Sequence, residues 1–164
     1  MKRLVVYYSL EGNTQLMAEG MARILGADLL RLEPEKAYAD KGAAKFIWGG
    51  RSAVMKEKPR LKPYYVKVAD YDEIIIGFPV WASTFAPPIR TFVSENKTSL
   101  KKKRIATFAC QAGNGAQKAF EKLKNYMEIE DFVATEIFIN PKTKPSDENV
   151  EKRDDFCREL RIME

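Results

Sequence analysis

The sequence contains no histidine and only two cysteines, Cys110 and Cys157. Zinc sites in proteins are built mainly from histidine and cysteine, and the common hydrolytic triads need a histidine as base. We therefore expect no metal site and no histidine-based catalysis. Two cysteines in a chain without a recognisable leader are expected to be free thiols rather than a disulfide.

Long hydrophobic runs are also missing. The first apolar run, at residues 4–8, has five residues and follows Met1-Lys2-Arg3, which is too short for a signal-peptide core or a membrane span. We therefore expect a cytoplasmic protein with no membrane contact. The chain has 164 residues, 45% of them hydrophobic and 31% charged, as is typical of one globular domain covering residues 1–164.

The charge balance is basic, with a net charge of +5. Basicity alone is compatible with nucleic acid, with acidic partners or with no specific partner; we expect no nucleic acid. The tightest basic cluster, at residues 101–104, precedes an apolar strand-like run. We interpret it as a solvated loop, with a docking patch as the alternative.

Strand-like apolar runs alternate with helix-like segments along the chain. The predicted strands lie at 4–8, 29–32, 73–78, 104–109 and 132–139. The predicted helices lie at 16–25, 87–93 and 116–126, with a last one after residue 146. This alternation predicts right-handed crossovers and a five-stranded parallel sheet with helices on both faces, which is an α/β protein of three α/β/α layers.

Details at the helix ends support this assignment. Gly26 is the expected C-terminal cap of the first helix and Ser146 the expected N-cap of the last, in which Val150, Cys157 and Leu160 should face inward. The lysine-rich segment at 35–68 gives a weak pattern, with one helix near 43–57 interrupted at paired glycines.

Three loops follow predicted strands, at 9–14, 79–84 and 110–115. Ligands of open parallel sheets bind beyond the carboxyl ends of the strands. The first loop carries the hydroxyls of Ser9 and Thr14 together with Gly12 and leads directly into a helix, whose N-terminus favours a phosphate. A plain turn capped by Asn13 or Thr14 is the alternative.

Two common nucleotide motifs are absent from the first loop. It lacks the Gly-Lys-Ser/Thr ending of a Walker loop, and no Gly-x-Gly-x-x-Gly follows the first strand. Acidic residues do not cluster at the end of that strand either, which argues against a receiver domain.

The three loops resemble those of flavodoxins. Tyr8-Ser9-Leu10-Glu11-Gly12-Asn13-Thr14 is similar to the flavodoxin phosphate loop, commonly Ser/Thr-x-Thr-Gly-Asn-Thr. Gly77-Phe78-Pro79-Val80-Trp81, followed by the helix at 87–92, resembles the second flavin loop, and 108–115 resembles the third. The resemblance covers residues 1–139 and implies the flavodoxin-like strand order 2-1-3-4-5.

The resemblance also implies FMN as a non-covalently bound cofactor. The resemblance implies that the FMN phosphate is bound by Ser9, Gly12, Asn13 and Thr14, with Leu10 and Glu11 completing the loop. It also implies that two loops flank the isoalloxazine ring, with the residues Pro79, Val80, Trp81, Ala82, Ser83, Thr84, Cys110, Gln111, Ala112, Gly113, Asn114 and Gly115. Trp81 is the best candidate for stacking on the ring; the alternative is a tryptophan packed inward under the loop.

The sequence departs from the family pattern at several points. Glu11 stands where threonine is common, and we expect its carboxylate to point away from the phosphate. The loop at 110–115 has no aromatic residue, so one ring face would be open or covered by Trp48. Cys110 could be redox-active beside a flavin, but we interpret it as a small apolar residue at a strand end.

Three functions are compatible with these features. The first is an FMN electron carrier that docks on a redox partner protein. The second is an FMN-containing reductase that oxidises NAD(P)H and reduces a quinone or a similar small acceptor. The third is a flavin-free domain, which would need three flavin-type loops to coincide by chance. Basicity and the missing aromatic favour the reductase, whereas the short chain favours the carrier, which is our first hypothesis, as a monomer or homodimer.

Overall fold

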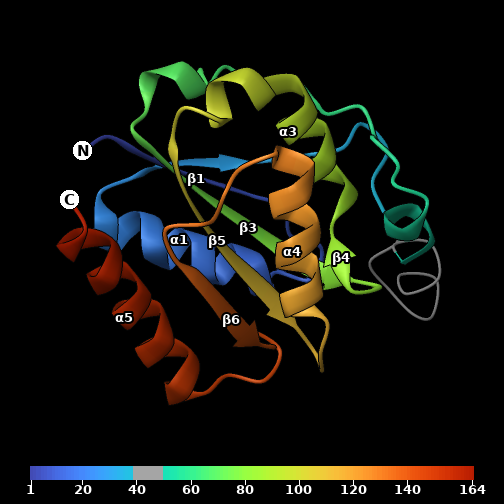
Figure 1. Ribbon diagram of the computed structural model, residues 1–164. Coiled ribbons are helices and arrows are strands. Elements are labelled where there is room, and N and C mark those ends of the chain that lie inside the picture. Colours follow the sequence, from blue (N-terminus) through green and yellow to red (C-terminus); the bar gives the residue numbers. More distant parts are fainter. Residues whose placement is uncertain (39–49) are drawn as a thin grey trace.

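The computed structural model describes residues 1–38 and 50–164, in which strands and helices alternate (Figure 1). The strands are β1 (Arg3–Tyr7), β2 (Asp28–Arg31), β3 (Glu73–Trp81), β4 (Thr84–Phe85), β5 (Arg104–Gln111) and β6 (Thr135–Ile139). The helices are α1 (Asn13–Leu25), α3 (Pro87–Leu100), α4 (Ala116–Met127) and α5 (Asp147–Ile162), with a short 3-10 helix η1 (Val68–Asp70). Residues 50–54 form a further helical turn.

Five of these strands are parallel and lie in the order β2-β1-β3-β5-β6. In the register, Val5 lies opposite Leu29 on one side and Ile75 on the other, and Ile75 lies opposite Ala106. The predicted parallel sheet with flavodoxin-like order is therefore confirmed. The structure adds one short strand, β4, which pairs antiparallel with β3.

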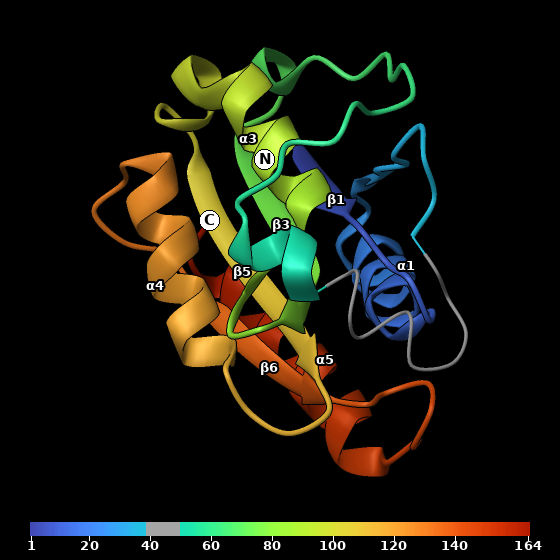
Figure 2. The same cartoon turned by 90° about the vertical axis from the view of Figure 1, so that its right-hand side faces the viewer.

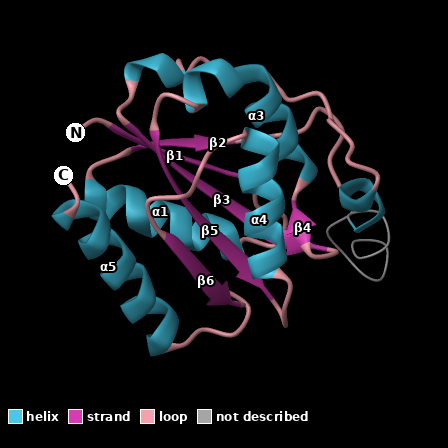
Figure 3. Ribbon diagram, in the orientation of Figure 1, coloured by secondary structure: helices cyan, strands magenta, loops and turns pink. Residues whose placement is uncertain are grey.

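Both faces of the sheet are buried under helices, as Figures 1 and 3 show. Along β1, Leu4 and Val6 belong to the core cluster that includes residues of α3 and α4, whereas Val5 and Tyr7 belong to the cluster with α1 and α5. Alternate residues of a strand point to opposite faces, so a continuous apolar run supplies both cores. The three-layer arrangement predicted from the sequence is confirmed.

Several predicted element boundaries need correction. Residues 79–84 are not simply a loop, because β3 continues to Trp81 and residues 84–85 form β4. Helix α3 extends beyond residue 93 to Leu100, through a polar stretch that carries no helical hydrophobic pattern. The last strand begins at Thr135 rather than at residue 132, since Phe132 packs its ring against Phe120.

The caps of the first and last helices agree with expectation. Gly26 ends α1 in the left-handed conformation, and the Ser146 hydroxyl accepts a hydrogen bond from the Asn149 backbone at the start of α5. Val150, predicted to face inward, is exposed. The inward position is taken by Asn149, whose buried amide bonds both backbone groups of Ile139 at the end of β6.

The segment between β2 and β3 is only partly comparable with its prediction. Trp48 and Gly49 lie outside the described residues, as does the first part of the helix predicted at 43–57. The turn at 50–54 falls within that prediction. Pro34 and Leu61 form an isolated antiparallel bridge that closes the base of this segment. Among the described residues, no helix is long and apolar enough to cross a membrane.

A buried ionic cluster joins three strands at their amino ends. The carboxylate of Glu73 at the start of β3 is fully buried and pairs with Arg3 of β1 at 2.6 Å and Arg104 of β5 at 3.2 Å. Arg3 also donates to the carbonyl of Leu160 in α5 at 3.1 Å. The cluster therefore ties the sheet to the last helix.

We expect Glu73→Gln to destabilise the fold by about 3–5 kcal/mol, because it leaves two guanidinium groups without their buried counter-ion. Urea unfolding at neutral pH followed by circular dichroism measures this cost. Glu33→Gln is the matched control, since Glu33 pairs with Lys62 at the surface and should change stability far less. Equal losses in both variants would contradict this account of Glu73.

Candidate functional site

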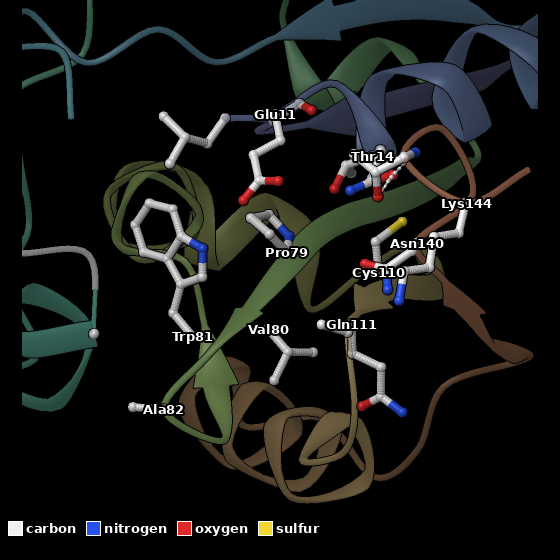
Figure 4. Close-up of a pocket in the computed structure, with 16 residues that line it drawn as sticks. Glu11, Thr14, Pro79, Val80, Trp81, Ala82, Cys110, Gln111, Asn140 and Lys144 are labelled. Atoms are coloured by element: carbon white, nitrogen blue, oxygen red, sulfur yellow. Dashed lines mark hydrogen bonds between the residues drawn. The ribbon is translucent and has the colours of Figure 1, made fainter. Parts of the chain in front are cut away.

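A pocket of about 400 Å³ lies at the carboxyl ends of β1, β3 and β5 (Figure 4). The three predicted loops meet there. The predicted residues that line it are Ser9, Leu10, Glu11, Asn13, Thr14, Pro79, Val80, Trp81, Ala82, Cys110, Gln111 and Ala112. The predicted residues outside the lining are Gly12, Ser83, Thr84, Gly113, Asn114 and Gly115.

At the first loop, the start of α1 is left without a side-chain cap. Its N-cap is Gly12, with φ of 97°, and neither Asn13 nor Thr14 takes the capping position. The Gly12 N–H donates to the Ser9 hydroxyl at 3.1 Å, which fixes the turn. The amides of the first helical turn have no partner within the helix, so they and the helix dipole form a site for an anion.

The hydroxyl of Thr14 supports the same interpretation. Thr14 lines the pocket and is 1% exposed, and its Oγ1 makes no hydrogen bond of normal geometry with the described residues; the Cys110 thiol, a weak partner, lies beside it. A buried hydroxyl without a normal hydrogen bond costs free energy unless a ligand supplies one. An anionic oxygen at the start of α1 would accept that hydrogen bond.

A fourth segment, which the sequence analysis missed, closes the pocket at residues 140–144. Asn140, Thr143 and Lys144 line the pocket. The side-chain oxygen of Asn13 accepts hydrogen bonds from the backbone of Lys142 at 2.8 Å and of Thr143 at 3.1 Å. Asn13 therefore holds this segment against the first loop with its side chain, besides lining the pocket.

The sequence did carry one signal for this segment. Asn140-Pro141 follows directly after β6, and such a pair at the end of a strand marks a turn at the ligand-binding edge of the sheet. The segment brings positive charge to the phosphate loop. The Lys142 side chain lies against Gly12, where an added Cβ would come within 2.6 Å of its Nζ.

The Glu11 side chain also enters the pocket. Figure 4 shows its carboxylate reaching from the first loop into the space above Pro79, and Glu11 belongs to the pocket lining. That this carboxylate points away from a bound phosphate stays a prediction. The described lining thus includes one acidic residue, Glu11, and one basic residue, Lys144.

The second loop is a tight hairpin between β3 and β4. Trp81 pairs with Thr84, so the turn consists only of Ala82 and Ser83, with φ values of 50° and 57°. A turn with two left-handed residues normally contains Asn-Gly. Without glycine, each left-handed residue costs about 1–2 kcal/mol, so backbone strain is stored at the pocket rim.

Contacts with the third loop hold this strained turn in place. Gly115, with φ of 103°, packs so closely that an added Cβ would lie 3.1 Å from the Ser83 Cα. The Lys122 ammonium group donates to the Ser83 carbonyl at 3.0 Å. Gly115 and Ser83 are therefore positioned to shape the pocket rim without lining the pocket.

Trp81 is the aromatic residue of the described pocket lining, and two tyrosines outside that lining support it. The Trp81 ring packs edge-on against Tyr8, with ring centres 5.6 Å apart, and against Tyr38 at 5.2 Å. The Tyr38 hydroxyl in turn contacts the Ser52 hydroxyl at 3.2 Å. Trp81 is half-buried and lines the pocket, so it combines inward packing with a surface for a ligand.

Cys110 and Cys157 are both buried free thiols. Burial raises the pKa of the Cys110 thiol to about 12, and the nearby Thr14 hydroxyl only partly opposes this shift. At neutral pH the group is a neutral thiol with little nucleophilic character. This supports the interpretation of Cys110 as a small apolar residue of the pocket wall.

Comparisons with known proteins agree with this geometry. The flavodoxin family model matches residues 2–153. The chain belongs to the flavodoxin family. No curated protein matches the sequence.

Several solved structures have a similar fold. A flavoprotein from Lactobacillus acidophilus in complex with FMN has 22% identity and a TM-score of 0.72, covering 93% of this chain and 98% of that chain. Oxidised flavodoxin 1 from Bacillus cereus has 17% identity and a TM-score of 0.60, covering 99% and 98%. Two-electron reduced flavodoxin from Megasphaera elsdenii has 19% identity and a TM-score of 0.58, covering 95% and 98%. At these identities the likeness concerns the fold.

The cofactor of the flavodoxin family is FMN, which has an anionic phosphate and a planar ring system. The uncapped start of α1 and the buried Thr14 hydroxyl fit the phosphate. Pro79, Val80 and Trp81 supply an apolar wall for the ring. The described residues therefore fit this cofactor.

We expect Thr14→Val to weaken FMN binding about 10- to 100-fold, because a hydrogen bond to a charged group contributes about 1.5–3 kcal/mol. Riboflavin binding should change little, since riboflavin lacks the phosphate. Titrations followed by flavin fluorescence give both affinities. Thr91→Val is the control, because Thr91 donates to the Pro59 carbonyl and does not line the pocket. Equal losses for FMN and riboflavin would contradict the assignment of the first loop.

We expect FMN to quench tryptophan fluorescence mainly through Trp81. Trp81→Phe should remove most of the quenching, because the indole is lost, and should weaken FMN binding, because the phenyl face next to the ring is smaller than the indole face. Trp48→Phe is the matched variant, since the chain has two tryptophans. If Trp48→Phe abolishes the quenching instead, the segment containing Trp48 forms the platform for the ring.

Proposed function

We propose that the protein binds FMN non-covalently in this pocket and uses it to transfer electrons. The observation that carries the proposal is the uncapped start of α1, where the buried Thr14 hydroxyl has only the weak Cys110 thiol beside it and no hydrogen bond of normal geometry among the described residues. The structure from Lactobacillus acidophilus, which contains FMN, supports the choice of cofactor.

Two modes of electron transfer follow from the sequence: docking on a redox partner protein, and direct oxidation of a nicotinamide nucleotide. The second is favoured by a cationic cavity beside the β3–β4 hairpin, which shares Ala82 with the FMN pocket and is lined by Lys56, Arg90 and Lys122. Positive charge next to the flavin site suits an anionic nucleotide substrate. We therefore propose a reductase that acts on NAD(P)H and a small acceptor, with the electron carrier as the alternative.

When bound, FMN would supply the redox chemistry: it would accept a hydride from NADPH and return the two electrons to a quinone, whose two protons would come from the reduced flavin and from solvent. The protein's part is to hold the ring against the wall formed by Pro79, Val80 and Trp81. Burial raises the pKa of the Cys110 thiol to about 12, so we assign it no role in proton transfer.

We expect NADPH alone to bleach the visible absorbance of the FMN-loaded protein within seconds, without a partner protein. Anaerobic stopped-flow absorbance measures the rate, and a later addition of a soluble quinone should restore the colour. Dithionite is the control that shows the bound flavin can be reduced. If dithionite bleaches the flavin and NADPH does not, the protein is an electron carrier rather than a reductase.

A further inference from the structure

A second cavity, of about 430 Å³, lies beside the β3–β4 hairpin. Its polar and charged lining consists of Lys56, Thr84, Arg90, Lys122, Asn125 and Tyr126. The lining comes from residues 53–56, the β3–β4 hairpin, α3 and α4, and Figure 2 shows how these parts of the chain are arranged. Ala82 at the tip of the hairpin faces both cavities.

The chemistry of this second cavity is set by Arg90. The residue is 8% exposed, and its guanidinium group lies between two aromatic rings, 4.5 Å from the centre of Phe85 and 4.4 Å from that of Tyr126. Contact with aromatic faces partly replaces the lost hydration of a cation. No carboxylate among the described residues pairs with it.

An arginine buried without an anion is unusual, because charged groups are rarely buried unless they are paired. Burial lowers the pKa of Arg90, while Tyr126 acts in the opposite direction. Arginine nonetheless keeps its charge at neutral pH. The cavity therefore holds a permanent cation that a ligand from solution can neutralise.

The rest of the lining points to a phosphate rather than to a single carboxylate. Lys56 and Lys122 add two further positive charges, and the described lining contains no aspartate or glutamate. Thr84 and Asn125 contribute polar side chains that can donate hydrogen bonds. Three cations with additional donors match a group that carries two charges and several acceptor oxygens.

We propose that this cavity binds a phosphate group of the nicotinamide nucleotide that reduces the flavin. The inference rests on the proposed function, and it names the residues that recognise the substrate. Lys122 links the two sites, since it lines the cavity and also donates to the carbonyl of Ser83 at the tip of the hairpin.

Binding of NADP⁺ to the FMN-loaded protein tests the proposal by isothermal titration calorimetry at low ionic strength. NADP⁺ cannot reduce the flavin, so binding is measured without turnover. We expect Lys122→Gln to raise the dissociation constant about tenfold or more, as for the loss of a hydrogen bond to a charged group. Glutamine retains a donor for the Ser83 carbonyl, and Lys122→Arg, which retains the charge, should restore binding.

Lys118→Gln is the matched control, because Lys118 lies on the same helix and outside the cavity and its loss changes the net charge equally. Arg90→Met removes the buried cation, and circular dichroism checks that this variant folds. Equal affinities in Lys122→Gln, Arg90→Met and Lys118→Gln would overturn the proposal, as would the absence of NADP⁺ binding. Inorganic phosphate binding as tightly as NADP⁺ would overturn the nucleotide assignment.

The two proposals can fail separately. The visible spectrum of the loaded protein shows whether FMN binds, and bleaching by NADPH shows whether the protein is a reductase. If NADPH bleaches the flavin and the Lys122 and Arg90 variants bind NADP⁺ as the parent protein does, the nucleotide lies elsewhere and only the assignment of this cavity is wrong.

Discussion

The unsatisfied amino end of α1 is the constraint on which the pocket depends. A helix leaves its first amides without partners, and most helices satisfy one of them with a capping side chain. Here the capping position is a glycine in a positive-φ conformation that other residues adopt only with strain. The chain thereby keeps a cluster of donors at the carboxyl edge of β1, and the neighbouring loops are arranged around them.

The parts of the fold and of the pocket that could be predicted are those encoded by residues close to one another in the sequence. The buried strands and the Gly12 loop are contiguous patterns, so strand order and three pocket walls followed from the sequence and its family resemblance. The fourth wall, at residues 140–144, is held by Asn13, 129 residues away from Lys142 in sequence. Hydrogen bonds over such a separation leave no periodic trace in a single sequence.

The hairpin at Ala82-Ser83 was missed for another reason. Neither residue favours the left-handed conformation, so local propensity argued against a two-residue turn. Tertiary contacts with Gly115 and Lys122 override that preference. The prediction that Val150 faces inward was wrong because Asn149 takes the inward position. Asn149 does so through hydrogen bonds to Ile139 rather than through apolar contact.

The attachment of residues 142–143 to Asn13 makes the carboxyl-terminal part of the chain one wall of the cofactor site. Residues 140–144 lead directly into α5, which packs against α1 and is bonded to Arg3. A ligand that binds the pocket stabilises the contacts between Asn13 and residues 142–143. Because these residues lead into α5, ligand binding should also stabilise the packing of α5 against the rest of the protein. Amide hydrogen exchange in α5, although the helix lies outside the pocket, would consequently report on cofactor occupancy.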